Sequence, residues 1–156
     1  MKLAQALIER ADLQRKLAQL AARLQQNAQY QEGEAPAEDP QELLADYRRS
    51  AAALTRLITA INRTNHDVTL ADGTPMLTAL AERDRLKAEH AMLGKVADAA
   101  MADQSRYSRS EIRTLAAVDI RALRREADDV AKRCRELDIR IQQANWDNDL
   151  VAEEGQ

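Results

Sequence analysis

The sequence predicts an all-α fold of long antiparallel helical hairpins that form a four-helix bundle or coiled coil. Ala, Leu, Glu, Arg and Gln dominate its 156 residues, and this composition is typical of bundles and coiled coils. Apolar residues recur in four stretches at alternating spacings of three and four, which is the heptad pattern of packed helices. Only four Gly and three Pro leave few places to turn. The length fits a single helical domain.

The first helix is expected over residues 2–29. Its apolar side chains follow a heptad seam from Leu3 to Leu24, in which Arg10 is the one charged residue. Residues 30–39 are polar and acidic, and we expect them to form a solvated, mobile linker.

The second helix is expected over residues 40–62. Asp39 can cap its N-terminus, and Pro40 suits its first helical position. The heptad pattern stops after residue 62, and Asp72-Gly73 is a turn signal. Residues 62–73 therefore predict a short extended hairpin turn at mid-chain.

The third helix is expected over residues 75–102 and the fourth over residues 119–145, with a polar loop at 103–111 between them. Gly94 lies inside the third helix, where glycine costs about 1 kcal/mol relative to alanine, so we expect close approach of another backbone there. The fourth helix has the cleanest seam, because none of its seam positions is charged. The tail at 152–156 is expected to fray.

Charge and motifs narrow the classes of function. The net charge of −3 and the pI near 5.5 argue against a nucleic acid or an anionic membrane as partner. No apolar run reaches the roughly 18 residues of a membrane span, and the N-terminus lacks the apolar core of a signal peptide, so we expect a cytoplasmic protein.

The single cysteine, Cys134, excludes an intramolecular disulfide, and its seam position predicts a buried, inert thiol. No phosphate-binding loop or catalytic nucleophile motif is present, so we expect no cofactor and favour a non-enzymatic role.

Charged residues in the polar segments and on the third helix form the candidate ligand site. Buried charges need partners, so these residues form either a structural ion-pair network or the rim of a site for a small anionic ligand. The candidates are Arg63, Asn65, Asp72, Arg83, Asp84, Arg106, Tyr107 and Arg109. The site requires that the segments 62–73 and 103–111 meet in space.

Three further side chains are of metal-ligating types: His66, Asp67 and His90. No His-x-x-x-His or Glu-x-x-His pair is present, so the sequence predicts no metal site. We expect instead that His66 is a loop residue and that His90 packs against a helix neighbour.

Several motifs are spread over essentially the whole chain. They are MKLAQALIERADLQ at the N-terminus, INRTN at 61–65, DG at 72–73, ALAERDRLK at 79–87, RYSRSEI at 106–112 and NW at 145–146. Together they resemble a family of small bacterial proteins labelled DIP-type or septicolysin-like. The resemblance implies an all-helical protein of unknown biochemical role, and its label adds membrane lysis as a candidate function. It assigns no role to individual residues.

The sequence thus leaves several functions open. A thin Ala/Leu core and the uncharged seam of the last helix favour a non-enzymatic homo-oligomer built through the seams of helices one and four. The alternative is a protein, including an enzyme, that binds a metal or a small anionic ligand at the candidate residues.

Overall fold

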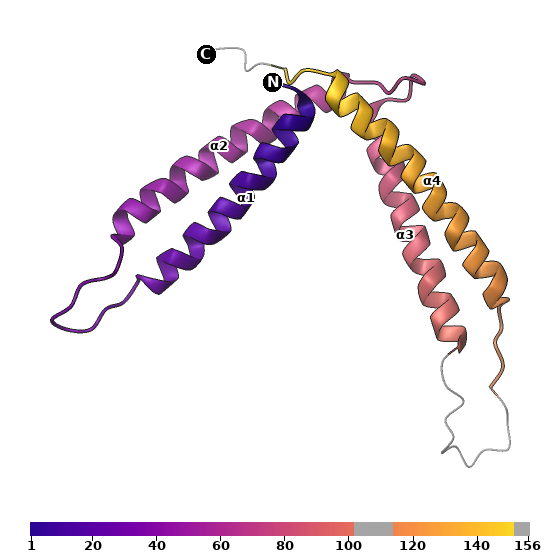
Figure 1. Cartoon of the computed structure of the whole chain (residues 1–156), viewed down its shortest axis with the longest axis horizontal. Helices are drawn as coiled ribbons and strands as arrows, with labels where there is room; N and C mark the ends of the chain where they lie inside the picture. The colour runs from indigo at the N-terminus through magenta and orange to yellow at the C-terminus, as the bar shows by residue number, and fades with distance from the viewer. Residues whose placement is uncertain (102–113, 152–156) are drawn as a thin grey trace. The chain divides into compact units, whose positions relative to one another are not determined.

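The computed structural model of the chain describes residues 1–101 and 114–151 (Figure 1). Within these residues the fold is all-α, as predicted, with four helices and no strand. The helices are α1 (Leu3–Gln26), α2 (Pro40–Asp67), α3 (Met76–Met101) and α4 (Ile120–Asp147). None of these helices contains a stretch that is both long and apolar enough to cross a lipid bilayer.

The chain divides into two compact units, each built around one helical hairpin. The first unit holds Met1–Val68 together with Gln143–Gln156, and the second holds Thr69–Gln142. Most of α4 therefore belongs to the second unit, and only its residues 143–147 belong to the first. The predicted pairing of consecutive helices is found, because α1 lies antiparallel to α2 and α3 lies antiparallel to α4 (Figure 1). The predicted loop at 103–111 and the predicted frayed tail at 152–156 lie outside the described residues.

Helix α2 begins where the sequence predicts and ends later than predicted. The Asp39 side chain accepts a hydrogen bond from the Gln41 backbone N–H at 2.8 Å, which caps the helix as expected. The helix then runs to Asp67, five residues beyond the predicted end at residue 62. Thr64 and Val68 are both buried and continue the buried face of the helix, so the predicted turn over residues 62–73 is shortened from its N-terminal side.

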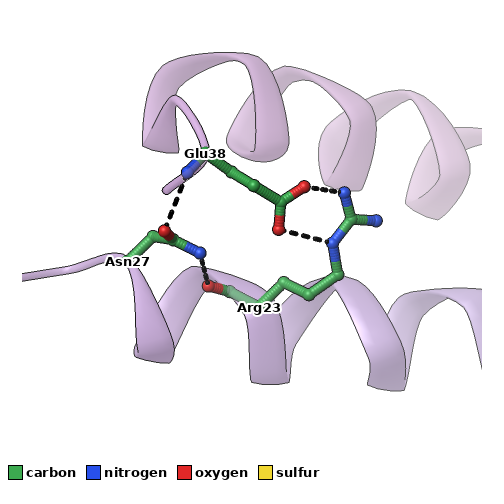
Figure 2. A network of polar contacts seen from close by, with 3 residues as sticks. All are labelled: Arg23, Asn27 and Glu38. Atoms are coloured by element: carbon green, nitrogen blue, oxygen red, sulfur yellow. Dashed lines mark hydrogen bonds and ion pairs between the residues drawn. The ribbon is translucent and has the colours of Figure 1, made fainter. Parts of the chain in front are cut away.

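The acidic linker between α1 and α2 is closed at its base by three side chains, shown in Figure 2. The Asn27 amide donates to the Arg23 carbonyl and accepts from the Glu38 backbone N–H, both at 2.9 Å. Arg23 and Glu38 form a two-pronged ion pair, in which Nε donates to Oε2 at 2.9 Å. The hydrogen bond from Arg23 holds the pKa of Glu38 below its ordinary value. These contacts fix both ends of the predicted mobile loop to each other.

The last described residues of the chain pack on the start of the first hairpin. Backbone hydrogen bonds join Leu3 N to Asn148 O at 3.0 Å and Leu150 N to Met1 O at 2.8 Å. The Leu150 side chain packs on a small apolar core formed by Leu3, Ala6 and Ile61, with Leu7 and Leu57 at its edge. The Thr64 hydroxyl accepts a hydrogen bond from the Val151 backbone N–H at 3.0 Å. The C-terminal segment therefore seals the open end of the hairpin.

The mid-chain turn of the second unit is a short extended hairpin, as predicted. Leu70 N donates to Thr74 O and Gly73 N donates to Leu70 O, both at 2.8 Å, and Thr69 pairs with Pro75 in an isolated β-bridge. Gly73 has a φ of 84°, a conformation that favours glycine. The sequence signal Asp72-Gly73 therefore predicts this turn correctly.

The uncharged seam of α4 is largely buried in the hairpin that α4 forms with α3. The seam residues Ala127, Val130, Leu137 and Ile141 are buried, as are Ala79, Leu86 and Ala97 on α3. Two predictions about this hairpin are wrong. In the described part of the chain, a Cβ at Gly94 would meet no atom within 4 Å, so the predicted close approach of another backbone is not found there. Cys134 is half-buried rather than buried.

Candidate functional site

The Arg83 side chain lies between α3 and α4 and is 22% exposed. Its Nη1 atom contacts Oδ1 of Asp138 on α4 at 3.3 Å, whereas its Nε atom lies 3.8 Å from Oδ1 of Asp84. The Nε atom is buried and forms no hydrogen bond with any described residue. The main partner of Arg83 among the described residues is therefore Asp138, which the sequence analysis does not single out.

A groove of about 480 Å³ lies beside this ion pair in the second unit. Its residues come from α3 and α4 and are Lys87, His90, Ala131, Cys134, Arg135, Asp138 and Ile139. The groove is thus lined by the basic side chains Lys87 and Arg135 and by the apolar side chains Ala131 and Ile139. Its one carboxylate, Asp138, is neutralised by Arg83. Such a surface can hold a small anion that carries an apolar group.

Asp72 stabilises the turn that precedes α3 and links it to α4. Its carboxylate accepts a hydrogen bond from the Thr74 backbone N–H at 3.0 Å and forms an ion pair with Arg140 of α4. The bonds from Thr74, followed by the charge of Arg140, hold the pKa of Asp72 below its ordinary value. This candidate residue therefore has a structural role, since it closes the turn and ties it to α4.

The other candidates do not gather in the described part of the chain. Arg63, His66 and Asp67 are exposed on the last turns of α2, and Asn65 is half-buried there. Arg106, Tyr107 and Arg109 lie outside the described residues. The required meeting of residues 62–73 with residues 103–111 therefore stays a prediction. Across residues 1–101 and 114–151, no three His, Cys, Asp or Glu side chains come together as metal ligands would.

A second surface feature is the outer face of α3, which the sequence analysis misses. Its inner face is buried through Met76, Ala79, Leu86 and Ala97. On the opposite face Leu77 is 49% exposed and, at the edge of that face, Met92 is 59% exposed. Ala81, Ala88, Ala91 and Ala99 are exposed on the same face. A helix-period count of every α3 residue, not only of its best stripe, would have found this second face.

Comparison with known proteins gives a structural relative and a family. A crystal structure of a functionally unknown conserved protein from Corynebacterium diphtheriae is similar, with 38% sequence identity and a TM-score of 0.89. The similarity covers 97% of this chain and 99% of that chain. A family described as "Family of unknown function (DUF6847)" matches residues 10–150. No curated protein matches the chain.

Proposed function

The chain belongs to the DUF6847 family of unknown function, and we propose that it is a non-enzymatic helical protein that associates with a second copy of itself in the cytoplasm. The observation that supports self-association is that α3 carries apolar side chains on two opposite faces. A helix whose apolar side chains are not confined to one face has apolar surface left over after it packs on one neighbour. Within residues 1–101 and 114–151 only one face of α3 is buried, and no described residue covers the other face.

The exposed apolar surface of α3 includes two large side chains, whose burial would favour association. Leu77 and Met92 are each about half exposed, and burial of apolar surface stabilises by roughly 25 cal/mol per Å². A second copy brings an identical apolar face, so pairing the two buries both at once. Part of the α1 and α4 seams, from which the sequence predicts assembly, is buried within the chain, as at Leu20 of α1 and Val130 and Leu137 of α4. Association is therefore proposed through α3.

The test is the mass in solution of the full chain and of two variants. Wild-type protein is expected to be dimeric at micromolar concentration in sedimentation velocity experiments. The double variant Leu77→Glu with Met92→Glu should be monomeric, because it places charge on the uncovered face. The control is Ile8→Glu on α1, a similarly exposed apolar residue in the other unit, and it should stay dimeric. A monomeric wild type, or a double variant that dimerises like wild type, would refute the proposal.

The alternative function is binding of a small anionic ligand, and the groove beside Arg83 is the observation that favours it. Inorganic phosphate and simple carboxylates are suitable probes in a thermal-shift assay. An increase in Tm that disappears in Arg135→Gln would support this function, and no shift with any probe would count against it. Metal analysis of the purified protein tests the metal-binding version of the same hypothesis.

The resemblance to septicolysin-like proteins adds membrane lysis as a third function. Dye-loaded vesicles that contain cholesterol provide the test. We expect no release of dye, and rapid release at micromolar protein would favour lysis over the first proposal.

A further inference from the structure

The outer face of α3 presents a row of residues at heptad spacing, four of them apolar and two charged. The row is Leu77, Ala81, Asp84, Ala88, Ala91 and Lys95, separated by alternating steps of four and three residues. Apolar residues at this spacing form the seam through which two helices pack against each other, and polar residues within such a seam select its register. The row is distinct from the inner face of α3, which is already buried within the hairpin.

This outer row contains one acidic and one basic residue, Asp84 and Lys95, and both lie midway across the width of the face. The Asp84 side chain is 73% exposed, and its ion pair among the described residues is the 3.8 Å contact with the adjacent Arg83. Lys95 is exposed and forms no ion pair within residues 1–101 and 114–151. The two residues lie eleven positions apart, which is roughly 16 Å along a helix. Ala88 and Ala91 lie between them.

We propose that two copies of the chain pair through α3 in an antiparallel, two-fold arrangement whose axis passes between Ala88 and Ala91. This proposal rests on the proposed function and specifies its interface. Asp84 of each copy then faces Lys95 of the other, and Ala88 of each copy faces Ala91 of the other. The pairing is self-complementary, as a two-fold interface must be.

Charge decides between this arrangement and the parallel one. Parallel pairing in register would place Asp84 against Asp84 and Lys95 against Lys95, and like charges across an interface oppose association. Antiparallel pairing turns the same four charges into two attractive pairs. The alanines at the centre allow the helices to approach at the short end of the usual range of about 8–10 Å. The charges therefore set the direction, and the small apolar side chains allow close contact.

Charge reversal tests the register directly. Asp84→Lys alone places two lysine pairs at the interface, and Lys95→Asp alone places two aspartate pairs there. Each change should raise the dimer Kd about tenfold or more, since two weak attractions become two repulsions. An equimolar mixture of the two variants restores every pair to opposite charge, so it should form a heterodimer about as tight as the wild-type dimer. The double variant Asp84→Lys with Lys95→Asp should likewise form a homodimer.

Matched controls are Glu9→Lys and Lys16→Asp, which reverse exposed charges on α1 and should leave the wild-type Kd unchanged. Circular dichroism checks that every variant keeps its helix content. If wild-type protein dimerises but the single variants bind as tightly as wild type, the antiparallel α3 interface is wrong and the proposed function survives. Failure of the mixture to recover also overturns the register. A monomeric wild type removes both proposals.

Discussion

Removal of the Thr64 hydroxyl tests how the C-terminal segment is held in the first unit. This side chain is 1% exposed, donates to the Ala60 carbonyl at 2.8 Å and accepts from the Val151 N–H at 3.0 Å. Thr64→Val keeps the shape of the side chain and removes both hydrogen bonds. The matched control is Thr59→Val on the exposed side of α2, where the hydroxyl donates only to the Thr55 carbonyl at 3.0 Å.

The two variants lose the same kind of bond to their own helix, and only Thr64→Val loses the bond to Val151. A hydrogen bond of this kind contributes about 1 kcal/mol, so Thr64→Val should lower the free energy of unfolding by about that much more than Thr59→Val. For a chain of this size the difference corresponds to roughly 2–4 °C in Tm. Chemical denaturation with urea measures the stability, and amide exchange of Val151 should accelerate in Thr64→Val alone. Equal unfolding midpoints together with unchanged exchange at Val151 would refute the reasoning.

Three other changes probe the hairpins and their charges. Ile61→Ala should destabilise by about 2–5 kcal/mol because Ile61 is buried in the small core, whereas Ile8→Ala, at an exposed site, should cost under about 0.5 kcal/mol; equal costs would contradict the assigned core. Gly94→Ala should stabilise by about 1 kcal/mol, since its Cβ enters open space inside a helix, and a loss of stability in thermal unfolding would show a hidden contact. The pKa values of Glu38 and Asp72 lie below their ordinary values of 4.5 and 3.8, so their stabilisation is complete above those values and is lost as the pH falls through the lower folded values. Urea titrations from pH 7 to pH 2 should show this loss, it should be smaller in Glu38→Gln, and an identical acid profile for the variant would count against the role of Glu38.

The predictable parts of the fold are those set by local chemistry. The start of α2 follows from Asp39-Pro40, and the mid-chain turn follows from Asp72-Gly73, because capping and positive φ depend on neighbouring residues. The end of α2 is missed because Thr64 is a polar residue at a seam position. Its hydroxyl is satisfied there by the Ala60 carbonyl of the same helix and by the Val151 N–H, and Val151 is far away in the sequence.

The candidate site is less predictable for a related reason. Arg83 is correctly singled out as a charge near a buried face, but its partner Asp138 lies 55 residues away in sequence. That pairing depends on the antiparallel register of α3 and α4, and heptad spacing alone does not specify a register. Arg140 as the partner of Asp72 is hidden for the same reason.

The mass of the wild-type chain in solution tests the central claim most directly. Light scattering coupled to size exclusion should give about twice the 17.5 kDa of one chain at high micromolar loading, and the mass should fall toward that of one chain on dilution. A constant mass of one chain across the whole concentration range would contradict self-association through α3.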